Sequence, residues 1–180
     1  MKIATDELIT DLMKRTRKCL AKGEQLRDLP EAALNLKQNE TSWSALECLE
    51  HLNLYGRFYI PELSKRVAEA RAGSEPVFKS GKLGNYFANS MLPKDKLNKM
   101  KTFKNMNPLN SRLNKDQVIA EFLEQQQELL RLLEHARKIS LNKTKTSISI
   151  SKWIKLKLGD TFRFVIYHNQ RHLVQAERDL

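Results

Sequence analysis

Two of the four histidines in the chain have the spacing of metal ligands. His168 and His172 are four residues apart in a segment with helical periodicity. One helical turn places both on the same face, about 6 Å apart along the axis. This H-x-x-x-H spacing lets two imidazoles bind one ion, as in helical zinc sites, although it is also common on helices that bind nothing. His135 has charged neighbours and is interpreted as a surface residue.

His51 is the third candidate ligand, and it lies in an earlier helical segment. It borders an apolar stripe, with Glu47 and Tyr55 one helical turn away on either side. A single core histidine is more often held by a hydrogen bond than by a metal. Metal sites in helical bundles, however, are built from side chains on facing helices. Three neutral imidazoles with open coordination positions are typical of a catalytic site, whereas a closed structural site needs a fourth ligand.

These histidines must be positioned by helices, because four segments of the chain show helical periodicity. The first covers about residues 5–26, the second begins near 41–44 and ends before Gly73, the third covers about 115–138, and the last begins near 156–161 and runs almost to the C-terminus. At the start of the second segment Ser44 and Glu47 fit a capping box, with Ser42 as an alternative cap. Between the second and third helices, residues 74–114 show no sustained period, and only a short helix over 83–91 is expected there. Residues 147–150 alternate briefly, as in an extended stretch. The pattern predicts an all-α four-helix bundle with a long connection between helices 2 and 3, forming a single domain over residues 1–180.

The composition is that of an ordinary globular protein. The 180 residues are 41% hydrophobic and 29% charged, which is enough for one substantial core. The two cysteines, Cys19 and Cys48, form no metal-binding pair and are interpreted as buried free thiols. No apolar stretch approaches the roughly 18 residues that a bilayer span needs. We therefore expect a cytoplasmic protein without membrane association.

A basic segment carries most of the net charge of +11. Residues 76–115 contain nine Lys or Arg against one acid, Asp95. We interpret this segment as a solvated surface connection. An alternative is that the chain is a non-catalytic protein that binds an anionic ligand or nucleic acid through the segment. Because no recognition helix or RNA-binding motif accompanies the charge, nucleic acid is not the expected partner.

Three stretches of sequence resemble the DinB/YfiT-like superfamily. The stretch WSALECLEHL (residues 43–52) resembles that family's second-helix motif. The stretches GDTFRF (159–164) and HNQRHLVQA (168–176) resemble its final-helix motif, in which two histidines flank an arginine and a glutamine follows. The order of the motifs agrees, and the resemblance spans essentially the whole chain.

The resemblance implies a four-helix bundle of up-down-down-up style and a divalent metal held by His51, His168 and His172. Family members are associated with nickel, zinc, iron or manganese. Several are transferases or isomerases that use a low-molecular-weight thiol, others are described as hydrolases, and many have no assigned reaction. The family often forms homodimers, which suggests one here.

The expected function is therefore that of a metal-dependent enzyme acting on a small molecule. A bound divalent cation can activate water or polarise a carbonyl, which gives a hydrolase, or it can deprotonate a bound thiol, which gives an S-transferase. The three ligands are common to both reactions and do not choose between them. As catalytic residues we predict Glu47, as an orienting group or general base, and Arg171, as the receptor of a substrate carboxylate. The alternative role of Glu47 is that of a capping-box carboxylate at the helix start, and the alternative role of Arg171 is a surface salt bridge.

Overall fold

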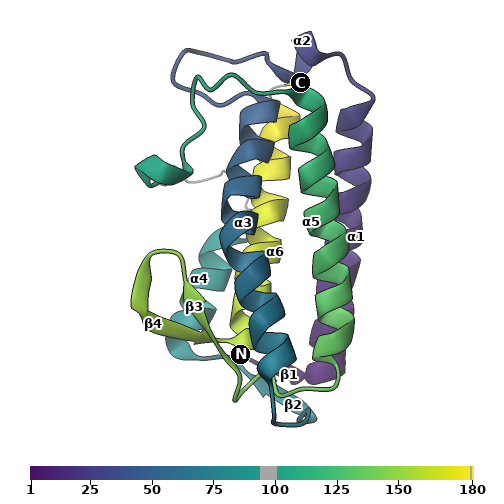
Figure 1. Cartoon of the computed structure of the whole chain (residues 1–180), viewed down its shortest axis with the longest axis vertical. Coiled ribbons are helices and arrows are strands. Elements are labelled where there is room, and N and C mark those ends of the chain that lie inside the picture. Colours follow the sequence, from purple (N-terminus) through teal and green to yellow (C-terminus); the bar gives the residue numbers. More distant parts are fainter. Residues whose placement is uncertain (94–100, 179) are drawn as a thin grey trace.

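The computed structural model describes residues 1–93, 101–178 and 180, which form a mostly helical structure (Figure 1). The four long helices are α1 (Thr5–Arg27), α3 (Ala45–Glu69), α5 (Lys115–Ala136) and α6 (Leu158–Arg178). They confirm the four helices predicted from periodicity to within a few residues. The shorter helical segments are α2 (Glu31–Leu34), α4 (Lys82–Met91) and the 3-10 helix η1 (Lys104–Met106), of which the sequence predicts only α4.

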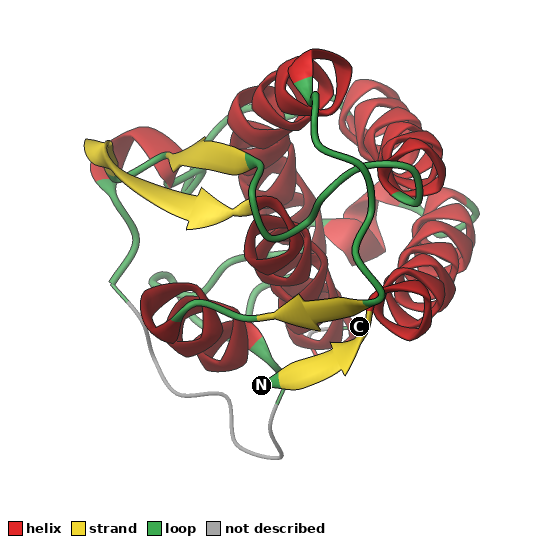
Figure 2. Ribbon diagram, turned by 90° about the horizontal axis from the view of Figure 1, so that it is seen from below, coloured by secondary structure: helices red, strands yellow, loops and turns green. Residues whose placement is uncertain are grey.

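The four long helices lie side by side, as Figures 1 and 2 show from two directions. Helix α1 packs against α5 and α6, and α3 packs against the same two helices. In Figure 1, α1 and α6 run upward while α3 and α5 run downward. Neighbours α3 and α5 are therefore parallel, and the side-chain amide of Asn53 on α3 donates to the Val118 carbonyl on α5 at 2.9 Å. The chain must return along the length of the helices between them.

Side-chain caps fix where α3 and α5 begin. The Ser44 hydroxyl accepts the Glu47 N–H at 3.2 Å, and the Glu47 carboxylate accepts the Ser44 N–H at 2.9 Å. This reciprocal pair is the capping box that the sequence predicts, and it satisfies two backbone donors that a helix start leaves free. At α5 the side-chain oxygen of Asn114 accepts the Gln117 N–H at 3.0 Å.

Two small antiparallel sheets correct the all-α prediction. Strand β1 (Lys2–Ala4) pairs with β2 (Val77–Lys79), and β3 (Lys145–Ile148) pairs with β4 (Ser151–Lys157). In the first sheet the fully buried Phe78 lies opposite Ile3, so strand pairing brings the start of the chain to the loop before α4. The second sheet includes part of the predicted extended stretch but is longer. Strands this short give too little alternation to be recognised from the sequence.

A buried ion pair ties α4 to α6. The Arg163 guanidinium donates to the Asp160 carboxylate at 3.1 Å, and both side chains are almost fully buried. The same guanidinium also donates to Asn85 and Asn89 of α4 at 3.1 and 2.9 Å. Because an unpaired buried charge is costly, these bonds fix α4 against α6. The close approach depends on Gly84, where a Cβ atom would lie 2.6 Å from the Cβ of Asp160.

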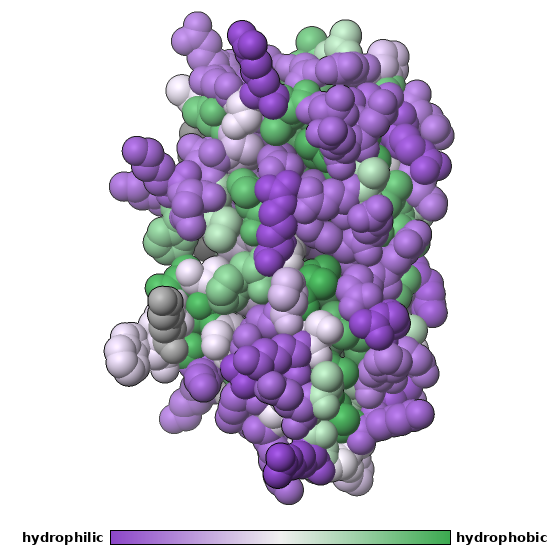
Figure 3. All heavy atoms as spheres, in the orientation of Figure 1, coloured by the Kyte–Doolittle hydropathy of each residue, from purple (hydrophilic) through white to green (hydrophobic). Residues whose placement is uncertain are grey.

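The surface is largely polar, with apolar side chains scattered over the face shown in Figure 3. Within the basic segment 76–115, the Lys and Arg side chains that the structure describes are exposed, apart from the partly buried Lys115, while Lys94, Lys96 and Lys99 lie outside the described residues. The most exposed aromatic side chain among the described residues is Trp153 on β4, which is 94% exposed. In the part of the chain that the structure describes, no helix combines the length and apolar character required to cross a bilayer.

The contact between Gly84 and Asp160 gives a test of the fold. We expect Gly84→Ala to lower the free energy of unfolding by about 1–3 kcal/mol, because the overlap with Asp160 outweighs the roughly 1 kcal/mol that alanine gains over glycine in a helix. The matched control is Gly73→Ala, where an added Cβ would meet no atom within 4 Å. This control should change the free energy of unfolding by less than about 0.5 kcal/mol. Urea titration of both variants and the unaltered protein measures the two effects. Equal stabilities of the two variants would show that α4 does not pack as described.

Candidate metal centre

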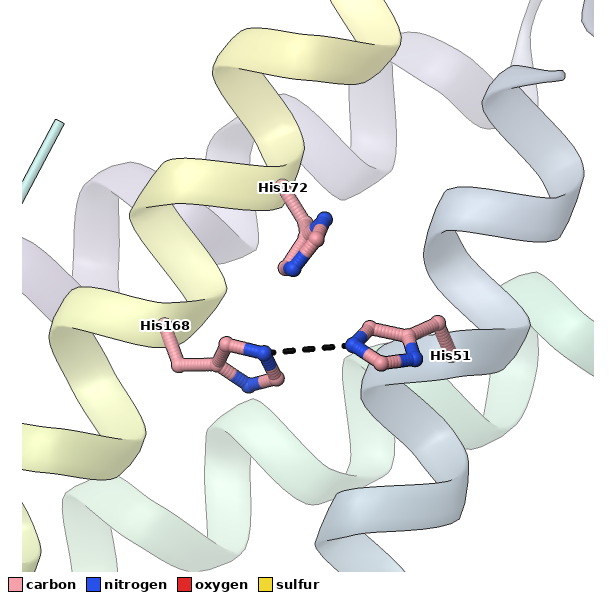
Figure 4. A group of neighbouring side chains, drawn as sticks. All are labelled: His51, His168 and His172. Carbon is pink, nitrogen blue, oxygen red and sulfur yellow. Dashed lines mark hydrogen bonds between the residues drawn. The ribbon is translucent and has the colours of Figure 1, made fainter. Parts of the chain in front are cut away.

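His51 on α3 faces His168 and His172 on the antiparallel helix α6 (Figure 4). Their nearest ligand atoms all lie within 4.8 Å of one another. His51 and His168 are buried, and His172 is partly buried. Among the described residues these three form the only such group of potential metal-binding side chains. The structure thus brings together all three ligands that the sequence predicts.

Hydrogen bonds at the rear of two rings define which nitrogens face the cluster. The Nδ1 atom of His51 lies 2.6 Å from the carbonyl oxygen of Met106, and the Nδ1 atom of His172 lies 3.0 Å from Oε1 of Gln175. Since both partners only accept, each Nδ1 carries the proton and donates. The Nε2 atoms of His51 and His172 are therefore left with free lone pairs. Acceptors behind the ring are the usual device that fixes a metal-binding histidine in one tautomer.

The donor set fits a single cation. The Nε2 atoms of His51 and His168 face each other at 3.2 Å, shown by the dashed line in Figure 4. Two lone pairs cannot face each other at this distance in the interior, so without a cation the His168 Nε2–H must donate to His51. An ion bound at about 2.1 Å from each nitrogen would accept both lone pairs instead. The spacing is thus compatible with one ion after a small adjustment of the side chains.

The surroundings hold the imidazoles in the neutral form that binds metals. Burial lowers the pKa of His51 from 6.5 to about 4, although its bond to Met106 opposes the shift. Burial also takes the pKa of His168 and of His172 well below the usual value, helped by electrostatic repulsion from His51 and Arg171. At neutral pH each ring therefore carries a single proton, and binding a cation at Nε2 of His168 requires only that the proton of this ring move to Nδ1.

Aromatic rings surround the cluster. The Trp43 ring lies 4.5 Å from the His51 ring between centroids, and the Tyr55 ring lies 4.6 Å from that of His168. The Phe164 ring stacks nearly parallel to the His168 ring, with 5.9 Å between centroids. Burial raises the pKa of Tyr55 to about 12, so its hydroxyl stays protonated. A small cavity of about 10 Å³ adjoins Tyr55, Phe164 and His168, with room for about one water molecule.

Glu47 lies one turn before His51, but its carboxylate contacts other groups. One oxygen accepts the Ser44 N–H in the capping box, and the other accepts the Asn110 N–H at 2.6 Å and the Lys37 ammonium at 2.7 Å. Its side chain is 4% exposed. These contacts favour the capping role over that of a general base, and the catalytic assignment stays a prediction.

Arg171 is also buried, between the two histidines of α6 in sequence. Its charge contributes to the lowered pKa of both His168 and His172, which places it within electrostatic reach of the cluster. Burial and repulsion from Arg178 lower the pKa of Arg171 itself. A role in binding a substrate carboxylate stays a prediction.

The sequence does not reveal two parts of this centre. The Met106 carbonyl is a backbone group, so no residue type marks it, and only the unusual length of the connection before α5 indicates that it has a task. Trp43 precedes the helix and would be interpreted as end packing, yet it lies against the His51 ring. Gln175, which follows the last histidine by three residues, is the one outer partner that could be proposed from spacing.

The tautomers are directly measurable in the metal-free protein. We expect Nδ1–H forms for His51 and His172 and an Nε2–H form for His168, read from proton–nitrogen NMR correlations of the rings. Gln175→Leu removes the acceptor behind His172 and should let that ring exchange between its two tautomers. Gln170→Leu is the control, because Gln170 bonds Arg15 and none of the three rings. An Nε2–H tautomer at His172 in the unaltered protein would contradict this geometry.

Comparison with known protein families gave a match. The model of one family, described as the DinB superfamily, matches residues 15–176, which include all three histidines and the four long helices except the first turns of α1 and the end of α6. Comparisons with curated proteins and with solved structures gave no match. A match over this much of the chain establishes the family, and the protein therefore belongs to the DinB superfamily.

Proposed function

We propose that the protein is a metal-dependent enzyme that acts on a small molecule. The observation that carries the proposal is the convergence of neutral imidazole nitrogens from His51, His168 and His172 on one point. Imidazole ligands suit nickel, zinc and iron, and three ligands leave a coordination position open for water or substrate. When bound, such an ion supplies a Lewis acid that lowers the pKa of a coordinated water or thiol.

The remaining parts of the proposal concern the chain's own residues. His51, His168 and His172 hold the ion, and their partners Met106 and Gln175 keep the rings oriented. Trp43 and Tyr55 cover two sides of the cluster and limit the access of bulk water. Arg171 is the candidate for attracting an anionic group of the substrate. We also propose that the four long helices form a four-helix bundle of up-down-down-up topology, supported by the helix pairs and directions described above.

The two candidate reactions differ in the group that the ion activates. Hydrolysis uses a coordinated water, whereas thiol transfer uses an external low-molecular-weight thiol, because neither Cys19 nor Cys48 belongs to the cluster. Burial raises the pKa of Cys19 to about 12, which keeps that thiol protonated and unreactive. Thiol-dependent loss of a substrate by the metal-loaded protein would favour the transferase, and turnover without any thiol would favour the hydrolase.

Metal content tests the site itself. Protein purified without an affinity tag or chelator should contain about one divalent ion per chain by mass spectrometry. The double variant His168→Ala/His172→Ala should lose it, while His135→Ala, an exposed histidine near the end of α5, should retain it. If the unaltered protein stays metal-free even after reconstitution with nickel, zinc, iron and manganese, the proposed function is wrong.

A further inference from the structure

The connection before α5 is attached to the start of α3 at three points. The Met106 carbonyl accepts from Nδ1 of His51 at 2.6 Å. The side-chain oxygen of Asn107 accepts the indole N–H of Trp43 at 3.0 Å. The Asn110 N–H donates to the Glu47 carboxylate at 2.6 Å. We call residues 103–110 the strap.

Two of the three attachment points, Glu47 and His51, lie on one face of α3, because they are four residues apart in the helix. The third, Trp43, lies just before the helix start, and its ring lies 4.5 Å from the His51 ring. The strap therefore lies along the start of α3, and its central carbonyl sits behind the His51 ring. A connection that merely joined two helices would have no need of three hydrogen bonds to this end of α3 and the residue before it.

Glu47 makes the bond nearest the end of the strap. Its Oε1 atom accepts both the Asn110 N–H and the Lys37 ammonium, and Lys37 also donates to the Asn110 side chain at 3.0 Å. Asn110 has a φ of 60°, a left-handed conformation that asparagine tolerates better than most residues. This turn aims the Asn110 N–H at the carboxylate. The Oε1 atom takes no part in the capping box, which uses Oε2 alone.

We propose that Glu47 is a positioning residue of the metal centre that acts through the strap. Its carboxylate holds residues 103–110 on α3, and the strap in turn presents the Met106 carbonyl that keeps His51 in the metal-binding tautomer. This assigns Glu47 a task other than that of a general base, and it makes the connection part of the site. The predicted effect of Glu47 on metal affinity rests on the proposed function, whereas the attachment of the strap to α3 by Glu47 does not.

Capping and strap docking can be separated, because they use different atoms of Glu47. Glu47→Gln replaces one carboxylate oxygen with an NH2 group, which only donates. The single remaining oxygen cannot accept from both the Asn110 and the Ser44 N–H. Ser44→Ala is the matched control, because it removes the other half of the capping box and leaves Oε1 with Asn110 and Lys37. Lys37→Met is a second test variant that disturbs only the strap side and keeps both capping bonds.

The experiment has a metal-free arm and a zinc arm. By hydrogen exchange without metal, the Asn110 amide should exchange at least about 10-fold faster in Glu47→Gln than in the unaltered protein, and it should be unchanged in Ser44→Ala. In competition with a chelator, zinc should bind about 10-fold more weakly to Glu47→Gln, the range expected when a partner behind a ligand is lost, and within about twofold to Ser44→Ala. Lys37→Met should also speed the exchange of the Asn110 amide and weaken zinc binding. It tests the proposal if Glu47→Gln does not fold.

The outcomes are distinguishable from a failure of the metal site. If the unaltered protein binds no zinc, the proposed function fails, while the exchange of Asn110 still reports whether Glu47 holds the strap. Faster exchange with unchanged zinc affinity would overturn the coupling between strap and metal. Equal effects of Glu47→Gln and Ser44→Ala on both readings would reduce Glu47 to a helix cap and overturn the proposal altogether.

Discussion

The centre of this structure depends on one constraint: imidazole nitrogens that face each other inside a protein need a proton or a cation between them. His51 and His168 meet in this way at 3.2 Å, where water cannot solvate their lone pairs. Burying such polar atoms costs free energy unless each has a partner. The acceptors behind His51 and His172 leave a lone pair of each ring facing the cluster, and burial keeps the rings neutral by lowering their pKa values.

Helix direction explains why the partner of His51 comes from a connection. Helix α3 has 25 residues, so it is about 37 Å long. Since α5 runs parallel to it, the chain must cover that distance again before α5 can start. The return path, residues 70–114, includes β2, α4 and η1 and ends beside the first turns of α3. There the backbone has free carbonyl groups, which a helix would have used internally. The parallel pair thus brings an acceptor to His51.

Sequence reasoning predicts those parts of the protein that periodicity and residue type encode. The apolar spacing predicts the four long helices, the pair Ser44 and Glu47 predicts the start of α3, and the family-like motifs predict the three ligands. The pairing of β1 with β2 could not be predicted, because three-residue strands have too little pattern. The role of Met106 was equally hidden, because it uses a backbone carbonyl, and any residue type supplies one. Glu47 shows a further limit: one carboxylate serves two structural tasks, and its spacing reveals only the cap.

The order of the helices also has a consequence for synthesis on the ribosome. Helix α1 is made first, yet it packs mainly against α5 and α6, whose first residues are Lys115 and Leu158. Its apolar face, which includes Leu8, Leu12 and Cys19, has no partner from α5 until about 100 further residues have been added. At a few to about 20 residues per second that delay lasts seconds, far longer than a helix takes to form. During this delay the apolar face of α1 stays exposed to solvent, where chaperones that bind short apolar segments have access to it.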